Sequence, residues 1–222
     1  MNDNRSAYSS NIYDDSIVNV LPYYREYHLQ ITDLVKTIGY KAPDWLDTGC
    51  GTGTLARMVF ESRKDVRFTL CDPSQNMLAQ AKEKLSGKDI RYFNVSSQQL
   101  EFESEFDVVT AVQSHHYLKP DERKTAVKKC YNALRQNGVF ITFENIRMSA
   151  DDSDEIALKR WAQFMTDHGR SDKDVQNHIE RRGVEVLPIT IEEHIKLLRE
   201  CGFRSVDLLW TSYLQAGFWA IK

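Results

Sequence analysis

The sequence has no apolar run long enough to cross a bilayer. Its longest apolar stretches fall well short of the roughly 18 residues that a membrane-spanning helix needs. Its polar first residues also do not resemble a signal peptide. We therefore expect a cytoplasmic protein without a membrane partner.

Cysteine is scarce, and neither sign of charge dominates. The four cysteines, at positions 50, 71, 130 and 201, show no C-x-x-C spacing, so neither a disulfide framework nor a cysteine metal site is expected. The formal net charge is −3, which gives no electrostatic attraction to nucleic acid. We expect a small-molecule substrate, no direct nucleic acid binding and no metal, and the composition is compatible with a homodimer.

Short apolar segments alternate with helical patterns along the chain. Strands are expected near 45–46, 66–70, 91–95, 106–112 and 139–144, and amphipathic helices at 22–38 and 119–135. Such alternation predicts an α/β fold with a parallel sheet and helices on both faces. We expect one domain over residues 1–222, which is long enough to bury a substantial core.

A glycine-rich loop follows the first predicted strand, over residues 47–53. It reads Asp47-Thr48-Gly49-Cys50-Gly51-Thr52-Gly53, and glycines at a helix start let a ligand lie against backbone N–H groups. A carboxylate at the root of the loop disfavours a phosphate and favours a ligand that carries an amine or a sulfonium. The loop therefore predicts a cationic, adenosine-bearing cofactor.

This loop resembles motif I of the class I S-adenosylmethionine (SAM)-dependent methyltransferases, and its spacing differs from the dinucleotide fingerprint G-x-G-x-x-G. The resemblance implies SAM as cofactor, with the loop residues Asp47, Thr48, Gly49, Cys50, Gly51 and Gly53 around it. It also implies a doubly wound, Rossmann-like, mostly parallel seven-stranded sheet. The two strand-like runs at 205–213 and 215–222 match that family's C-terminal antiparallel hairpin.

The second predicted strand ends at Asp72, about 20 residues after the loop. A carboxylate there can accept hydrogen bonds from two ribose hydroxyls. Asp72 could instead begin the next helix, but Ser74 is the better N-cap. The resemblance implies that Pro73, Ser74 and Met77 flank the adenine, although Met77 also fits an ordinary helical core position.

The segment after the third strand departs from the family pattern. The family usually places an acid there to contact the adenine amino group, and this chain has Ser96 and Ser97, followed by Gln98. A serine hydroxyl accepts a hydrogen bond more weakly than a carboxylate. Either adenine is held less tightly, or Gln98 contributes, or the alignment shifts by one residue.

The fourth predicted strand runs into polar residues at 113–117. Ligands of open α/β sheets bind beyond the carboxyl ends of central strands, and the resemblance places Gln113 beside the methionine part of SAM. His115 or His116 could serve as a general base near pH 7, or one of them could simply pack. Glu144, at the end of the fifth strand, is a further candidate base, and Tyr117 could orient the acceptor.

Two regions outside the sheet pattern are expected to select the substrate. The first is an N-terminal helical cap, residues 1–40, rich in tyrosine and including Tyr13 and Tyr24. Aromatic rings with polar tips suit a lid that excludes water, and they equally suit ordinary packing. The second is a helical lid insertion, residues 145–188, with Arg147 and Trp161 as candidate substrate contacts.

The sequence therefore predicts a SAM-dependent methyltransferase that acts on an oxygen or nitrogen of a small molecule. A partial likeness to carboxy-SAM synthases gives an alternative; it rests on residues 13–15, Glu193-His194, Gly202-Phe203 and the terminal run 218–222. Those enzymes make a SAM derivative used in tRNA wobble-uridine modification. The likeness implies an arginine for the added carboxylate, with Arg147, Arg181 and Arg182 as candidates. A non-catalytic SAM-binding domain is the third hypothesis.

Overall fold

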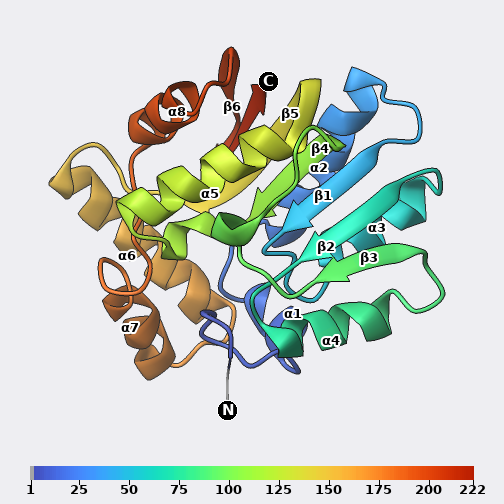
Figure 1. Ribbon diagram of the computed structural model, residues 1–222. Coiled ribbons are helices and arrows are strands. Elements are labelled where there is room, and N and C mark those ends of the chain that lie inside the picture. Colours follow the sequence, from blue (N-terminus) through green and yellow to red (C-terminus); the bar gives the residue numbers. More distant parts are fainter. Residues whose placement is uncertain (1–2) are drawn as a thin grey trace.

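A seven-stranded sheet forms the centre of the protein in the computed structural model, which describes residues 3–222 (Figure 1). The strand order is β3-β2-β1-β4-β5-β7-β6. Strands β1 to β5 are parallel, and β7 runs antiparallel to both β5 and β6. The strands are β1 Asp44–Thr48, β2 Arg67–Cys71, β3 Ile90–Phe93, β4 Phe106–Val112, β5 Leu134–Asn145, β6 Ser205–Ser212 and β7 Gln215–Ile221. The predicted mostly parallel sheet with a C-terminal antiparallel hairpin is confirmed.

Helices cover both faces of this sheet. Helices α2, α3, α6 and α7 contribute buried side chains to one core cluster, and α5 and α8 contribute to the other. The helices are α1 Tyr13–Ile17, α2 Tyr24–Ile38, α3 Thr54–Ser62, α4 Gln75–Lys84, α5 Pro120–Ala133, α6 Asp151–Asp167, α7 Asp172–Glu180 and α8 Ile191–Glu200, with 3₁₀ turns η1 Ser97–Gln99 and η2 His115–Tyr117. Helices α6 and α7 lie in the segment 145–188, where the sequence predicted helices.

The boundary between α5 and β5 differs from the prediction. The helix was expected to reach residue 135 and the strand to begin at 139, but the strand begins at Leu134. Leu134 is fully buried and pairs with Phe106, and the register shifts before Val108 pairs with Val139. Asn137, in a left-handed conformation with φ 66°, thus lies at an irregularity inside β5 and not at a helix end.

The start of α2 also differs. Helix α2 begins at Tyr24, not at residue 22, because Tyr23 has a left-handed backbone with φ 59° and precedes the first helical turn.

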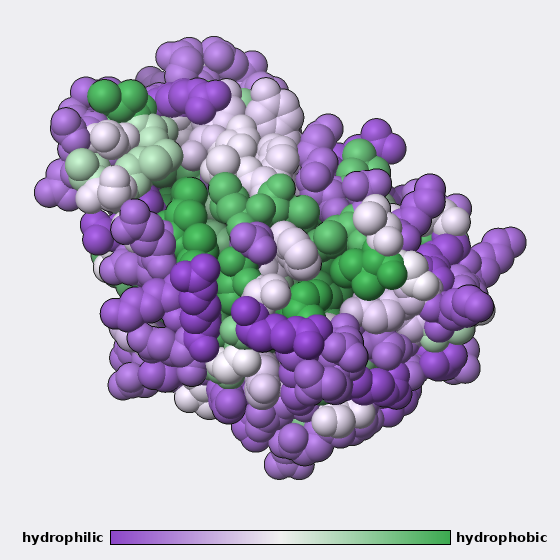
Figure 2. Space-filling model, turned by 90° about the horizontal axis from the view of Figure 1, so that it is seen from above, coloured by the Kyte–Doolittle hydropathy of each residue, from purple (hydrophilic) through white to green (hydrophobic). Residues whose placement is uncertain are grey.

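The surface is mostly polar. Figure 2 shows a face on which hydrophilic side chains dominate and apolar ones gather in one band across the middle. Over residues 3–222, the structure contains no helix with both the length and the hydropathy required to cross a bilayer.

Candidate active site

The glycine loop connects β1 to α3 at the carboxyl edge of the sheet. All three of its glycines have positive φ, at 68° for Gly49, 54° for Gly51 and 76° for Gly53. A Cβ on Gly49 would lie 2.5 Å from the Cβ of Ser114, so glycine is required for the close approach to the end of β4. A Cβ on Gly51 would meet no protein atom within 4 Å, because the loop opens there into a cavity.

Asp72 joins the end of β2 to this loop. Its Oδ2 accepts a hydrogen bond from the Gly51 N–H at 2.9 Å, and its Oδ1 accepts one from the Ser74 N–H at 2.8 Å. Ser74 itself caps α4, since its hydroxyl accepts from the Met77 N–H at 3.0 Å. Burial raises the pKa of Asp72. The carboxylate lines the cavity and retains lone pairs for a ligand hydroxyl.

A cavity of about 270 Å³ lies between the glycine loop and the ends of β2, β3 and β4. It brings together nine of the residues that the sequence assigned to the cofactor. These are Gly49, Gly51, Asp72, Pro73, Met77, Ser96, Ser97, Gln98 and Gln113. Together they line one cavity beyond the carboxyl ends of the central strands, where open α/β sheets bind their ligands.

Residues of the N-terminal segment also line this cavity, which the sequence did not predict. Asp3 accepts a hydrogen bond from the Ser74 hydroxyl at 2.6 Å, and Arg5 donates one to the Tyr117 carbonyl at 2.6 Å. No motif marked residues 3–6, because their role depends on where the chain passes and not on a local pattern.

Asp47 lies behind the glycine loop, outside the set of cavity-lining residues. It is 1% exposed, and its Oδ1 accepts from the Thr110 hydroxyl at 2.7 Å. Burial raises the pKa of Asp47 to about 7, although the hydrogen bond from Thr110 opposes this shift. Asp47 would therefore act on a cationic cofactor through its charge, over a distance, and not by direct contact.

The other predicted cofactor residues that do not line the cavity are Thr48, Cys50, Gly53 and Ser74, and they shape its walls from behind. Thr48 is fully buried, and its hydroxyl lies 2.9 Å from that of Ser97. The Ser97 hydroxyl in turn lies 3.0 Å from Nε2 of His115. Burial lowers the pKa of His115 to about 4, so this histidine is neutral and internally bonded at pH 7.

Glu144 is buried and accepts four hydrogen bonds. The donors are the backbone N–H groups of His115 (3.3 Å) and His116 (2.9 Å), the Thr142 hydroxyl (2.7 Å) and Nδ1 of His116 (2.8 Å). Burial opposes ionisation, but these donors and the two imidazoles lower the pKa of Glu144 to about 2. A carboxylate held this way is a poor base, which corrects the expected role of Glu144; it orients His116.

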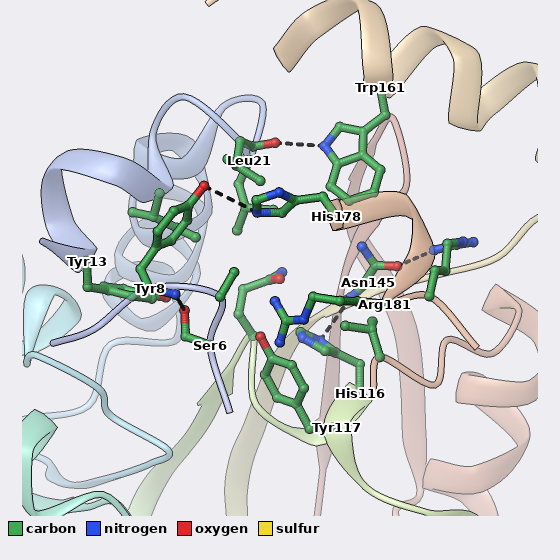
Figure 3. A pocket seen from close by; sticks show the side chains of 16 residues that line it. Ser6, Tyr8, Tyr13, Leu21, His116, Tyr117, Asn145, Trp161, His178 and Arg181 are labelled. Atoms are coloured by element: carbon green, nitrogen blue, oxygen red, sulfur yellow. Dashed lines mark hydrogen bonds between the residues drawn. The ribbon is translucent and has the colours of Figure 1, made fainter. Parts of the chain in front are cut away.

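His116 faces a second cavity, of about 60 Å³ (Figure 3). Nδ1 of His116 lies 2.8 Å from Oε2 of Glu144 and 3.3 Å from the backbone nitrogen of Asn145. Because an ionised carboxylate only accepts hydrogen bonds, the shorter contact assigns the proton to Nδ1. In the neutral imidazole, Nε2 then carries the lone pair that can accept a proton. The pair has the arrangement of a general base and its orienting acid.

Side chains from distant parts of the chain enclose this inner cavity. Tyr8 lies within hydrogen-bond distance of Nε2 of His178, at 3.2 Å, and Trp161 donates to the Val20 carbonyl at 2.7 Å. Figure 3 shows Tyr8 and Tyr13 on one side and Trp161 and His178 above. The segments that contribute them are the N-terminal segment, α6 and α7, which the sequence predicted as the substrate-selecting regions.

The two cavities adjoin. Ser6, Tyr13, Gln113 and Tyr117 line both of them. Gln113 has a positive φ of 53°, which is unusual for a residue with a side chain, and its amide donates to Gln215 at 2.8 Å. A group bound in one cavity can therefore reach a group bound in the other.

Two predicted substrate contacts lie elsewhere. Tyr24 packs its ring against Tyr27 and His28 and lines neither cavity. Arg147 is half-exposed and lies 3.9 Å from Glu193. Neither side chain lines the two cavities, although the Tyr24 hydroxyl bonds with that of Tyr13, which lines both; the two assignments stay predictions.

Comparison with known proteins is consistent with this geometry. Residues 46–140 match the family described as "Methyltransferase domain". Among solved structures, the CurJ carbon methyltransferase superposes with a TM-score of 0.67 at 16% identity, over 96% of this chain and 57% of that one. PigF, solved with S-adenosylhomocysteine (SAH), superposes with a TM-score of 0.64 at 15% identity, over 90% of this chain and 57% of that one.

Residues 46–140 thus resemble a methyltransferase domain, and the whole chain has the fold of solved methyltransferases. One relative along nearly its whole length is the carboxy-S-adenosyl-L-methionine synthase of Campylobacter lari, which is 24% identical over 208 residues, 92% of this chain and 88% of that protein. In this fold, the larger cavity lies where the glycine loop, Asp72 and η1 converge. The smaller cavity lies beyond it, under the N-terminal segment and α7.

Proposed function

We propose that this methyltransferase domain transfers a methyl group from SAM to an oxygen or nitrogen of a small molecule bound in the inner cavity. The observation that carries the proposal is the Glu144–His116 pair, bonded at 2.8 Å, which faces a cavity adjoining the cofactor cavity.

The reaction is an in-line displacement. A lone pair of the acceptor attacks the methyl carbon, the carbon–sulfur bond breaks, and SAM becomes SAH. Nε2 of His116 takes the proton that the acceptor loses, and Glu144 stabilises the resulting imidazolium. The protein otherwise contributes positioning and the exclusion of water.

The size of the inner cavity limits what reacts there. At roughly 10–15 Å³ for each water-sized group, it holds about five non-hydrogen atoms. A wider depression of about 320 Å³ shares Ser6, Ala7, Tyr8, His178 and Arg181 with it. The reacting end of the acceptor would enter the inner cavity, and the rest would lie in the depression.

The test is SAH formation from SAM with panels of small alcohols, phenols and amines. We expect an acceptor that supports turnover in the wild type. With that acceptor, His116→Ala should lower kcat by at least about 100-fold while the Kd for SAM stays within about threefold of wild type. Unchanged turnover in His116→Ala would refute the assignment of the base. SAM binding without turnover on any acceptor would favour the non-catalytic hypothesis.

A carboxy-SAM synthase-like activity is the second candidate function. It is supported by the relative that covers 92% of the chain and by Arg181 and Arg182, which line the inner cavity while Arg147 does not. Arg182 pairs with Asp154, and Arg181 pairs with Glu185 and donates to the Arg5 carbonyl, so either arginine would exchange a partner to hold a carboxylate. Mass spectrometry of the nucleoside released by protein purified from cells distinguishes the two functions, because carboxy-SAM is heavier than SAM by one carboxyl group.

A further inference from the structure

The wall of the cofactor cavity that follows β3 has no carboxylate, and its two serines are already engaged. The Ser96 hydroxyl and backbone N–H both donate to Oε1 of Gln99, at 2.9 and 3.0 Å. The Ser97 hydroxyl lies between Thr48 and Nε2 of His115, at 2.9 and 3.0 Å. Neither serine is therefore available as the main hydrogen-bond partner of a bound base.

Gln98 differs from both serines. Its side chain lines the cavity, and its Oε1 is buried without a hydrogen-bond partner. An unpaired buried acceptor costs free energy, so such groups in native proteins are usually satisfied, often by a ligand. Because no protein group holds this oxygen, the Gln98 amide is free to turn toward a donor on a ligand in the cavity.

We propose that the Gln98 amide reads the edge of the purine ring of the cofactor and makes this site tolerant of a 6-oxo purine. The proposal rests on SAM being the cofactor, as proposed above. Adenine presents an amino donor at N6 beside an acceptor at N1, and an amide presents an acceptor beside a donor. Gln98 can therefore pair with both positions at once.

An amide at this position can bind a 6-oxo purine, which a carboxylate cannot. Hypoxanthine presents an acceptor at position 6 beside a donor at N1, which is the reverse of adenine. A half-turn of the glutamine amide exchanges its oxygen and nitrogen and restores both hydrogen bonds. A carboxylate has no donor, so it would leave the 6-oxo group unpaired and would reject that base.

Among the other polar groups of this lining, the hydroxyl oxygen of Ser114, beyond the end of β4, is also buried without a partner, whereas the carboxylates are engaged. Asp3 accepts from the Ser74 hydroxyl (2.6 Å) and from the Asn76 N–H (3.2 Å), at the start of α4. Asp72 accepts from Gly51 and Ser74. Pro73 and Met77 add apolar surface to the lining. Asp3 is the competing reader of the base, because it is the other carboxylate on the cavity wall beside α4.

Calorimetric titration with SAH and its deaminated analogue S-inosylhomocysteine tests the proposal. The wild type should bind the two with Kd values within about tenfold of each other. Gln98→Glu should widen this ratio to at least about 100-fold in favour of SAH. Gln98→Leu should weaken SAH binding about tenfold. Gln163→Leu, an exposed glutamine on α6, is the matched control and should change neither Kd.

Two results would overturn the proposal. One is SAH binding by Gln98→Leu that equals the wild type while Asp3→Asn loses affinity, which would make Asp3 the reader. The other is a wild type that binds SAH but rejects S-inosylhomocysteine by about 100-fold or more. A wild type that binds neither ligand would instead refute the proposed function, and thermal unfolding of each variant shows whether it is folded.

Discussion

At the residue scale, the glycine loop and its acid have separate tasks. Gly49 permits contact with Ser114, and Gly51 opens the loop to the cavity. Asp47 does not line the cavity, and its carboxylate accepts a hydrogen bond from the Thr110 hydroxyl. Because its pKa is raised to about 7, its charge at neutral pH depends on the pH of the solution and on a nearby cation.

The affinity for SAM should therefore rise with pH. Ionised Asp47 attracts the sulfonium, so the ratio of SAM to SAH affinity should grow by up to about tenfold between pH 6 and pH 8. SAH has no sulfonium charge and serves as the internal control. Asp47→Asn should remove the pH dependence, which calorimetry at several pH values would measure. A ratio that stays flat in the wild type would contradict this role.

Asp47 should also reduce the stability of the empty protein above neutral pH. Its folded pKa is above the unfolded value of 3.8, so the folded state holds the proton more tightly and loses stability as pH rises from about 4 through 7. Asp47→Asn should raise the free energy of unfolding at pH 8 by on the order of 2 kcal/mol. Urea denaturation would measure it, and a less stable variant would show that the carboxylate supports the fold.

Glu144 should have the opposite effect on stability. Its folded pKa of about 2 is below the unfolded value of 4.5, so its contribution is present above pH 4.5 and is lost as pH falls through 2. Glu144→Gln should destabilise the fold by about 1–3 kcal/mol at pH 7, because buried donors lose their acceptor. Glu144→Gln should also lower turnover, as His116→Ala does. A variant with the stability and turnover of the wild type would contradict the pairing of Glu144 with His116.

The residue-scale predictions from sequence succeeded where a local motif fixed the position. Asp72 follows a strand and a glycine loop, and it lies against Gly51 as that spacing implies. The distinction between His115 and His116 could not be predicted, because it depends on which ring meets Ser97 and which meets Glu144. Arg147 and Tyr24 do not line the two cavities, because the sequence does not fix the direction in which a side chain points.

At the element scale, the short helix α1 is fastened to the glycine loop. Asp14 accepts from the hydroxyls of Thr52 (2.7 Å) and Thr54 (3.1 Å) and pairs with Lys84 at 2.5 Å. This helix also carries Tyr13, which lines both cavities. A five-residue helix has little stability alone, so these contacts decide its position.

Removing the contacts between α1 and the glycine loop should weaken SAM binding. Asp14→Ala should raise the Kd for SAM by about three- to tenfold, with a faster dissociation rate, because Tyr13 no longer covers the cavity reliably. Stopped-flow displacement would measure the rate. Asp15→Ala, an exposed neighbour on the same helix, is the matched control. Equal rates in the two variants would show that α1 does not retain the cofactor.

Element types were predicted from periodicity better than element ends. The buried strand β4 was predicted at its observed residues, since a short, nearly continuous apolar run favours a buried strand over an amphipathic helix. The start of β5 at Leu134 was missed, because the helical pattern of α5 continues through it and only pairing with Phe106 makes it a strand. The residues 3–6 carry no periodicity at all, and only the tertiary structure places them at the cavity.

At the scale of the whole molecule, ligand binding and folding are coupled. The cofactor cavity is lined by the N-terminal segment, the glycine loop and the ends of β2, β3 and β4, so a ligand there holds distant segments together. Cytoplasmic location, a homodimer and the absence of nucleic acid binding stay predictions.

SAH should therefore stabilise the whole chain against heat. At a concentration 100 times its Kd, a ligand adds about 2.7 kcal/mol, which for a chain of this size corresponds to a Tm increase of roughly 5–10 °C. Differential scanning fluorimetry with SAH, and with adenosine as the weaker comparison, would measure it. An unchanged Tm at saturating SAH would contradict binding to the folded state.

The most direct test of the central claim is calorimetric titration of SAM into the wild type and into Gly51→Val at pH 8. A Cβ at position 51 meets no protein atom within 4 Å, Gly51 lines the cofactor cavity, and its φ of 54° strains a valine there, so thermal unfolding must first show that the variant is folded. We expect one SAM bound per chain by the wild type and no measurable binding by a folded Gly51→Val. Failure of the wild type to bind SAM, or equal binding by both proteins, would contradict the assignment of this cavity to the cofactor.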